Sequence, residues 1–330
     1  ARTMLNRNQS RLRLLYLGAP PADTAQRTAM RDYWSLGRDV GNQLAEFRPT
    51  TPDSVSAILV ESNGTALSLY PAGFDVAGLA RDTSTIRLGT LVTPVTFRHL
   101  GDFAVIAAQV DQMSNGRVDI GLGAGWYGAE HESFGIPFPE VPTRYDMLED
   151  QLAVLEGAWS APSGTTFDYV GKTTSVHIPV DTVRPAQSPH PPIVLGGQGG
   201  PKSARLAATY AAEYNTPFVP VDRMRATHDK IRAACEDSGR DPGSIVYSVA
   251  LVLCCGETET ELERRATAIG RDVSELRENG LAGTPAELVQ KIATYAEAGA
   301  ERFYLQLLDL SDLDQIRLVA EQVMPHSPGI

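Results

Sequence analysis

The chain has 330 residues, 42% of them hydrophobic, which is long and apolar enough for one continuous α/β core. Its 40 acidic and 29 basic side chains give a formal charge of -11, which argues against a nucleic-acid or anionic-membrane partner because both require a basic face. Three cysteines, two of them adjacent in an apolar run, favour neither a disulfide framework nor a metal site and fit a reducing cytoplasm.

The N-terminal segment places arginines ahead of an apolar stretch, as a secretory signal does, but this stretch is too short for one. The longest apolar run elsewhere, residues 249–255, is far too short to cross a bilayer. We therefore expect a soluble, cytoplasmic protein.

Eight short apolar runs alternate with helical patterns along the chain. Strands separated by helices in this way favour a closed parallel (β/α)8 barrel, or TIM barrel, in a single domain over residues 1–330. Residues 160–191 mix Thr, Gly, Pro and Val without a helical period, so we expect an insertion loop with one small hairpin there. The predicted strands are residues 12–17, 57–60, 86–92, 118–122, 192–195, 213–216, 245–253 and 302–308.

Three of the predicted helices carry clear end signals. The apolar stripe in residues 103–113 stops at Asn115-Gly116, where glycine accommodates a left-handed cap. A second helix, with apolar residues from 148 to 159, is predicted to open at the pattern Thr143-x-x-Asp146. A third begins at Thr284-Pro285-Ala286-Glu287 and ends at Gly299.

Residues 118–135, VDIGLGAGWYGAEHESFG, combine a buried strand with a glycine-rich strand end and a sudden polar cluster. The glycines would clear side chains so that a flat molecule can lie against the backbone; the alternative is that they serve tight barrel packing alone. The glycines are Gly121, Gly123 and Gly125, and the cluster at the barrel mouth is Trp126, Tyr127, Glu130 and His131.

Residues 191–215, PPIVLGGQGGPKSARLAATYAAEYN, run from a strand into a glycine-rich turn and a proline-led helix. Backbone amides of such a turn, with the helix N-terminus behind them, bind phosphate; a plain strand-to-helix turn is the alternative. The spacing is that of neither a Rossmann nor a Walker motif. The candidate phosphate ligands are Gly197, Gln198, Gly199, Gly200, Lys202 and Ser203.

Residues 87–99, RLGTLVTPVTFRH, form a third strand end, where Thr90 and Thr93 would offer hydroxyls to a ligand or serve strand packing alone. No metal triad, GxSxG elbow or cysteine with a neighbouring base is present, so we predict no metal. The chemistry then belongs to an organic cofactor. A redox-active ring over the strand ends, with its phosphate on the helix N-terminus, accounts for all three segments.

The strings LARDTSTIRLGTLVTPVTFRH, AAQVDQMSNGRVDIGLGAGWYGAEHESFGIPF and VRPAQSPHPPIVLGGQGGPKSARLAATYAAEYNTPF resemble the bacterial luciferase-like monooxygenase superfamily, specifically its deazaflavin-dependent oxidoreductase branch. The resemblance implies a (β/α)8 barrel with an inserted segment, a homodimer, and coenzyme F420 or FMN at the C-terminal strand ends. It implies that Thr90 to Thr93 back the ring, that Gly123, Gly125 and Trp126 flank it, and that Gly197 to Ser203 take the phosphate.

Residues 1–77 depart from the family pattern. Their second strand carries Glu61, Ser62 and Asn63 where the resemblance leads us to expect an acidic residue, such as glutamate, followed by histidine. The candidates for proton transfer are therefore Glu130, His131 and Glu61, in that order.

We hypothesise F420-dependent hydride transfer between the coenzyme and a small organic substrate, with Trp126 and Tyr127 shaping the substrate side of the ring. An FMN-dependent two-component monooxygenase is the first alternative, because the two cofactors share the ring and the phosphate that these motifs grip. A flavin-binding protein without turnover is the second, supported by the missing histidine of the second strand.

Overall fold

The computed structural model describes residues 12–18, 57–62, 72–309 and 312–327, with only the backbone described for 12–18, 57–62 and 72–75. Eight parallel strands within these ranges pair in chain order, and the last pairs with the first, which closes the ring. The predicted (β/α)8 barrel is confirmed. The strands are β1 (Leu12–Gly18), β2 (Ala57–Ser62), β3 (Arg87–Gly89), β5 (Val118–Gly123), β8 (Ile193–Gly196), β9 (Glu213–Pro217), β10 (Val246–Cys255) and β12 (Arg302–Leu307).

Two short strands extend this ring. β4 (Thr93–Pro94) pairs with the end of β5, and β11 (Leu281–Gly283) pairs with the end of β10. The predicted continuous strand over residues 86–92 is therefore wrong, because the chain leaves the sheet after Gly89 and returns only at Thr93.

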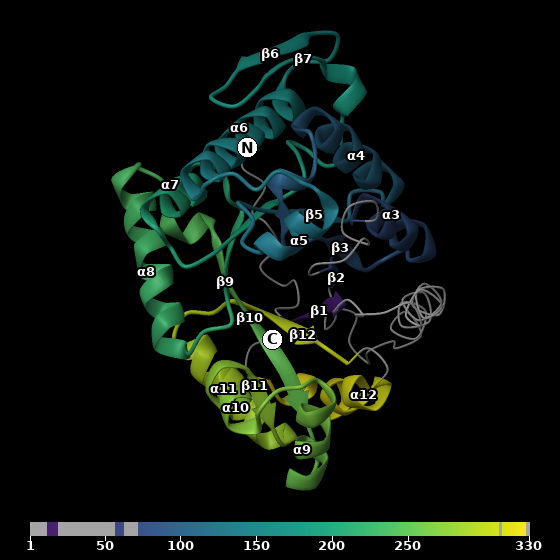
Figure 1. Cartoon of the computed structure of the whole chain (residues 1–330), viewed down its shortest axis with the longest axis vertical. Coiled ribbons are helices and arrows are strands. Elements are labelled where there is room, and N and C mark those ends of the chain that lie inside the picture. The colour runs from purple at the N-terminus through teal and green to yellow at the C-terminus, as the bar shows by residue number, and fades with distance from the viewer. Residues whose placement is uncertain (1–11, 19–56, 63–71, 310–311, 328–330) are drawn as a thin grey trace.

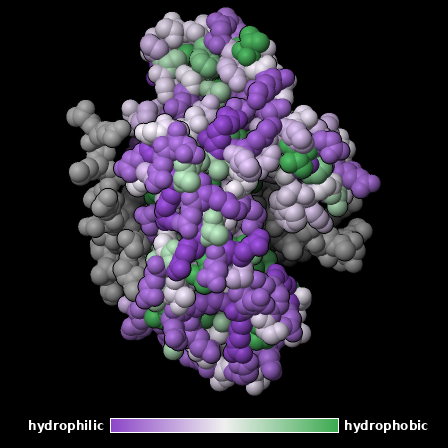
Figure 2. All heavy atoms as spheres, turned by 90° about the vertical axis from the view of Figure 1, so that its left-hand side faces the viewer, coloured by the Kyte–Doolittle hydropathy of each residue, from purple (hydrophilic) through white to green (hydrophobic). Residues whose placement is uncertain are grey.

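Helices surround the ring in Figure 1 and bury their apolar faces against its outer surface. The face that α7 and α8 present to solvent is mostly hydrophilic (Figure 2). The helices are α3 (Ala72–Asp82), α4 (Leu100–Met113), α5 (Gly128–Phe134), α6 (Val141–Ser160), α7 (Pro201–Tyr210), α8 (Val221–Asp237), α9 (Glu259–Ala268), α10 (Val273–Asn279), α11 (Pro285–Glu297) and α12 (Leu313–Gln322), with short 3-10 turns η1 (Val95–Phe97), η2 (Val180–Val183), η3 (Pro242–Ser244) and η4 (Met324–His326).

Two of the three predicted helix ends are confirmed. Asn115 and Gly116, just after α4, both have positive φ, and the Thr284–Glu287 capping box opens α11. The predicted start of α6 at Thr143 is wrong. The helix begins two residues earlier, after Glu140, because a proline in the first turn already has the helical φ and has no amide hydrogen to leave unpaired.

The inserted segment between α6 and β8 forms the antiparallel hairpin β6 (Thr166–Val170) and β7 (Ser175–Pro179), at the top of Figure 1. Asp150 on α6 fastens the hairpin, because its buried carboxylate accepts hydrogen bonds from Tyr169 Oη at 2.9 Å and from the Thr173 amide at 2.7 Å. Burial alone would raise the pKa of Asp150, but the hydrogen bonds from the Thr173 hydroxyl and amide, the Lys172 amide and Tyr169 together outweigh it and hold the pKa below its usual value.

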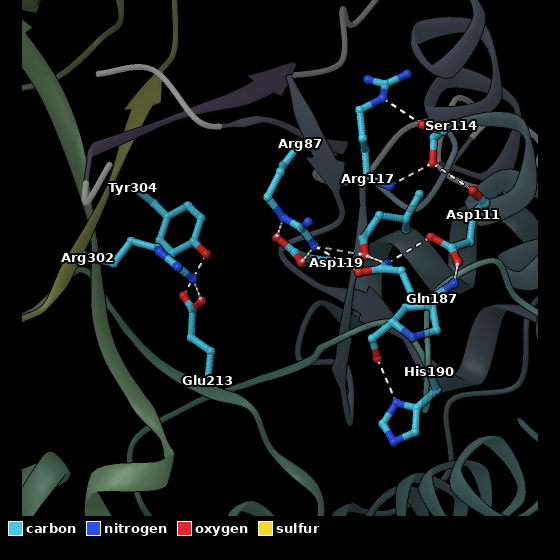
Figure 3. Close-up of polar contacts among 12 residues, drawn as sticks. Arg87, Asp111, Ser114, Arg117, Asp119, Gln187, His190, Glu213, Arg302 and Tyr304 are labelled. Atoms are coloured by element: carbon cyan, nitrogen blue, oxygen red, sulfur yellow. Dashed lines mark hydrogen bonds and ion pairs between the residues drawn. The ribbon is translucent and has the colours of Figure 1, made fainter. Parts of the chain in front are cut away.

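Charged residues lie at the N-terminal ends of several barrel strands (Figure 3). Glu213, the first residue of β9, pairs with Arg302 and accepts a hydrogen bond from Tyr304 Oη at 2.6 Å. Arg87, the first residue of β3, pairs with buried Asp119. In barrels of this kind the ligand site lies at the carboxyl ends of the strands, opposite these ion pairs.

His228 on α8 is a buried histidine with one unpaired ring nitrogen. Its Nε2 donates to the Ser248 carbonyl oxygen at 3.3 Å, so Nδ1 carries the lone pair, and Nδ1 has no partner. Burial, with a smaller contribution from Arg232, lowers the pKa of His228 to about 4, although the bond to Ser248 and the charge of Asp229 oppose the change.

We predict that His228 makes folding stability depend on pH between 6.5 and about 4. In this window the unfolded chain binds a proton at His228 and the folded chain does not, so stability falls as the pH falls, by up to about 1.4 kcal/mol per pH unit. His228→Phe should flatten the dependence in urea unfolding between pH 4.5 and 7.5. The exposed His326→Gln variant should retain it, and an unchanged slope in His228→Phe would contradict the assignment.

Candidate functional site

The three segments singled out in the sequence meet at one edge of the barrel. Thr90 follows β3, Gly123 ends β5 and Gly197 follows β8. Because β3 pairs with β5 and β5 pairs with β8, these strand ends are neighbours on the C-terminal rim. This is the rim on which (β/α)8 enzymes carry their active sites.

Between β3 and β4 the chain forms a bulge over residues 90–92, in which the Leu91–Val92 peptide bond is cis. A Cβ atom on Gly121 would overlap the Thr90 carbonyl oxygen, and one on Gly123 would lie 2.8 Å from Val92 Cγ2. These two glycines are therefore needed for the bulge to pack on β5. A ring-binding role for Gly123 and Gly125 stays a prediction.

The hydroxyls of Thr90 and Thr93 hold the bulge in place. Thr93 Oγ1 donates to Thr90 Oγ1 at 3.0 Å, and Thr90 Oγ1 donates to the Gly121 carbonyl oxygen at 3.0 Å. Each hydroxyl has thus given its hydrogen to the protein, and only acceptor capacity is left for a ligand. A small cavity of ≈ 30 Å³ lies beside them, large enough for water.

Two aromatic side chains project from the mouth just after β5. Gly125 turns the chain with φ +80°, and the next two residues, Trp126 and Tyr127, are 73% and 44% exposed with ring centroids 5.2 Å apart. Large exposed aromatic groups on a barrel rim are candidates for ligand contact, since they otherwise cost free energy in water.

His131 on α5 is buried at 1% exposure, and both of its ring nitrogens are hydrogen-bonded. Nδ1 lies 2.8 Å from the Tyr127 carbonyl oxygen, which can only accept, so Nδ1 carries the hydrogen and Nε2 accepts from Thr96 Oγ1 at 2.6 Å. The imidazole also packs against Phe97 and Phe138. It thereby ties α5 and the aromatic pair to the connection between β4 and α4.

The other two proton-transfer candidates are placed less completely. Glu130 is 7% exposed at the start of α5, beside His131 in sequence and close to the rim. Glu61 lies on β2, where its backbone pairs with Leu17, and its side chain is outside the described residues. The roles of Glu130, His131 and Glu61 stay predictions.

The glycine-rich turn after β8 is held by β9. The Gly197 amide donates to the Asn215 carbonyl oxygen at 3.0 Å, and the Gly199 amide donates to Tyr214 Oη at 3.1 Å. Ser203 Oγ lies 2.9 Å from the same tyrosine hydroxyl. Helix α7 then begins after Gly200 without a side-chain cap, and a side chain at Gly200 would project into open space. The first turn of α7 is thus open to an anion.

Lys202, predicted to add a positive charge to this turn, directs its ammonium group to α6 instead. Lys202 Nζ lies 3.0 Å from Asp146 Oδ1, which also pairs with Lys172 of the hairpin. The hydrogen bond from Lys202, followed by that from Lys172, lowers the pKa of the Asp146 carboxyl. Gln198 is exposed, with Nε2 3.5 Å from the Pro217 carbonyl oxygen.

The ion pairs continue along α6 and α7. Glu149 on α6 binds Arg205 of α7 at 2.9 Å and Lys172 at 2.8 Å, and these contacts lower its pKa to about 2. The carboxylates of α6 therefore join the inserted hairpin to the helix that follows the glycine-rich turn.

Sequence reasoning missed Tyr214, Thr96 and Phe138. Strand alternation places Tyr214 on the outer face of β9, where it is covered by helices. Because a buried tyrosine needs a hydrogen-bond partner for its hydroxyl, the alternation pattern could have indicated that Tyr214 contacts the neighbouring turn. The contacts of Thr96 and Phe138 with His131 join residues 35 and 7 positions apart and follow from no local pattern.

Within the described part of the chain, no group of three or more His, Cys, Asp or Glu side chains is placed to hold a metal ion. None of the helices described there is long and apolar enough to span a membrane.

A profile of the luciferase-like monooxygenase family matches residues 74–280, more than half of the chain. The chain belongs to this family, and the match begins close to the end of the segment, residues 1–77, that departs from the family pattern. The strands β1 and β2 of that segment nevertheless complete the barrel.

Among curated proteins, the FMNH(2)-dependent dimethylsulfone monooxygenase of Pseudomonas putida is 28% identical over 155 residues, which cover 47% of this chain and 40% of that protein. The F420-dependent glucose-6-phosphate dehydrogenase of Microbacterium testaceum is 32% identical over 142 residues, covering 43% of this chain and 40% of the relative. The matched stretches span less than half the length of these relatives.

Solved structures share the fold over nearly the whole chain. The coenzyme F420 dependent tetrahydromethanopterin reductase from Methanopyrus kandleri superposes with a TM-score of 0.73 at 18% identity, covering 97% of this chain and 99% of its own. The oxygenating constituent of 3,6-diketocamphane monooxygenase of Pseudomonas putida, in complex with FMN, gives a TM-score of 0.74 at 18% identity, covering 96% and 98%. At these identities the likeness establishes the fold.

We predict that Gly121→Ala destabilises the protein by about 3 kcal/mol or more, because the added methyl group overlaps the Thr90 carbonyl oxygen and forces backbone to move. Gly200→Ala, whose methyl group would enter open space, should cost no more than about 1 kcal/mol, the cost typical of alanine at a helix N-cap. Urea unfolding of both variants measures the difference. Equal stabilities would show that the bulge tolerates a side chain on β5.

Proposed function

We propose that the protein is an F420-dependent oxidoreductase that transfers a hydride between the deazaflavin coenzyme and a small organic substrate. The observation that carries the proposal is the meeting of three features on adjacent strand ends: the packed bulge after β3, the exposed aromatic pair after β5, and the open first turn of α7 after β8. The 32% identity to an F420-dependent dehydrogenase supports the deazaflavin as a cofactor.

The residues present fit such a cofactor. The uncapped first turn of α7, with open space at Gly200, suits a phosphate, which amides and a helix N-terminus bind without a counter-charge. Trp126 and Tyr127 suit the substrate side of an aromatic ring. When bound, the deazaflavin supplies or accepts a hydride at C5.

The chain itself would contribute placement and a proton. Backbone amides at the start of α7 and the Ser203 hydroxyl would hold the phosphate, and the hydrogen bonds of His131 would fix the loop that carries the aromatic pair. Glu130 remains the first candidate for proton transfer, because His131 uses both of its nitrogens within the protein.

An FMN-dependent monooxygenase is the second candidate. Its support is the FMNH(2)-dependent relative at 28% identity and the FMN-bound structural neighbour. FMN carries the same ring outline and phosphate, so the contacts described above suit it as well. A flavin-binding protein without turnover is the third candidate.

Binding and turnover assays separate the three. Purified protein is titrated with F420 and with FMN while cofactor fluorescence is followed. We expect tighter binding of F420, and reoxidation of its reduced form by a panel of carbonyl and enone substrates. Preferential FMN binding with substrate-dependent O₂ uptake would favour the monooxygenase, and binding without any turnover would favour the binding protein. Absence of binding to both cofactors would contradict all three.

We predict that Gly200→Asp weakens F420 and FMN binding by about tenfold or more while the fold stays intact. Gly200 is the N-cap of α7 with φ -64° and ψ 157°, a conformation that aspartate adopts readily. Its carboxylate would accept hydrogen bonds from the first-turn amides and repel a phosphate, and the melting temperature should stay unchanged or rise.

Gly200→Ala is the matched control, because it adds a methyl group without charge or acceptor. It should bind both cofactors within about twofold of the unaltered protein. If Gly200→Asp bound them as tightly as Gly200→Ala does, the phosphate would have to lie elsewhere.

A further inference from the structure

Tyr214 stands behind the glycine-rich turn and has no exposed surface. Its backbone lies in β9 between Leu195 of β8 and Tyr247 of β10, and its ring packs in the apolar layer that α7 covers. Burial raises the pKa of the Tyr214 hydroxyl, so the group keeps its hydrogen near neutral pH. A buried hydroxyl of this kind has one hydrogen to donate and lone pairs to accept with.

The two contacts of this hydroxyl can be assigned a direction. The Gly199 amide can only donate, so at 3.1 Å it gives its hydrogen to Tyr214 Oη. Ser203 Oγ, at 2.9 Å, is the one acceptor that the structure gives the tyrosine hydrogen among the described residues. If Ser203 donated instead, the buried tyrosine hydrogen would be unpaired at a cost of about 1–3 kcal/mol. The opposite direction leaves the Ser203 hydrogen without a partner among the described residues instead, but Ser203 is 6% exposed at the open end of α7 whereas Tyr214 has no exposed surface, so we assign Tyr214 as the donor.

This direction leaves the hydrogen of the Ser203 hydroxyl free for another acceptor. Ser203 lies in the first turn of α7, the part of the helix whose amides have no intrahelical partner. Lys202, the neighbouring cationic side chain, is held by Asp146 at 3.0 Å. The Ser203 hydroxyl is thus a side-chain donor available to an anion at this helix end.

We propose that Tyr214 is a positioning residue for the cofactor phosphate: it fixes the Gly199 amide and, by donating to Ser203 Oγ, turns the Ser203 hydroxyl hydrogen toward the anion. The inference rests on the proposed function, since it concerns the phosphate of the same cofactor. Its consequence is that Tyr214 determines how strongly the site prefers a phosphorylated cofactor to the same ring without phosphate.

The test compares FMN with riboflavin, and F420 with its phosphate-free deazaflavin, by fluorescence titration. Tyr214→Phe removes the hydroxyl and keeps the ring that fills the apolar layer. We expect the affinity for FMN and for F420 to fall by about tenfold, the size of a weakened hydrogen bond to a charged group, while the affinity for the phosphate-free rings stays within about twofold. A general loosening of the fold would weaken both kinds of ligand together.

Ser203→Ala provides a second variant, independent of the tyrosine. It should reduce the preference for the phosphorylated cofactor by a similar factor, and the double variant should lose little more than either single one, because both changes remove the same donor. Strictly additive losses in the double variant would overturn the assigned relay.

Tyr247→Phe is the matched control. Tyr247 is also a buried tyrosine, on the neighbouring strand β10, and its hydroxyl donates to the Pro242 carbonyl oxygen at 3.2 Å. This variant should lose stability of the same order and keep the phosphate preference. If Tyr214→Phe keeps the same ratio of FMN to riboflavin affinity as the original protein, the inference is overturned and the proposed function still stands. If the original protein binds none of the four ligands, the proposed function itself is refuted.

Discussion

The close approach of the bulge after β3 to the backbone of β5 determines the shape of the barrel mouth. It requires that Gly121 and Gly123 have no side chains, since the Thr90 carbonyl oxygen and the Val92 side chain occupy that space. Once the bulge is seated, β4 pairs with the end of β5 and brings Thr96 within reach of His131. The loop that presents the aromatic pair is fixed as a result.

The two ends of the barrel carry different kinds of residues. Ion pairs such as that of buried Glu213 with Arg302 lie at the N-terminal ends of the strands. The C-terminal end has glycine-rich turns, exposed aromatic rings and the open first turn of α7. A flat ring with a phosphate suits this end, because stacking and amide hydrogen bonds need little charge.

Much of the barrel could be predicted from the sequence, because each strand is a short apolar run bounded by turn residues. The eight runs correspond to the eight strands that close the ring. The break at Thr90 could not be predicted, since it depends on a contact with Gly121, 31 positions further along the chain. The start of α6 was misplaced because Pro142 favours an earlier first turn over the Thr143 pattern.

The places of the three segments that form the candidate site could be predicted for a similar reason. Glycine-rich strand ends are visible in a sequence, so the location of the turn after β8 followed from its residues. The partners of side chains are not visible in this way. The attachment of Lys202 to Asp146, 56 positions away, and the contact of Tyr214 with Ser203 depend on which helices and strands pack together.

The carboxylates of α6 connect the inserted hairpin electrostatically to helix α7. Asp146 and Glu149 each hold Lys172 of the hairpin turn together with a cation of α7, Lys202 or Arg205. A relative with a longer, shorter or missing hairpin would leave these carboxylates with one cation fewer and α7 with a different electrostatic anchor. A change in the least regular part of the barrel would thereby alter the electrostatic surroundings of the helix proposed to hold the cofactor phosphate, while every strand stays unchanged.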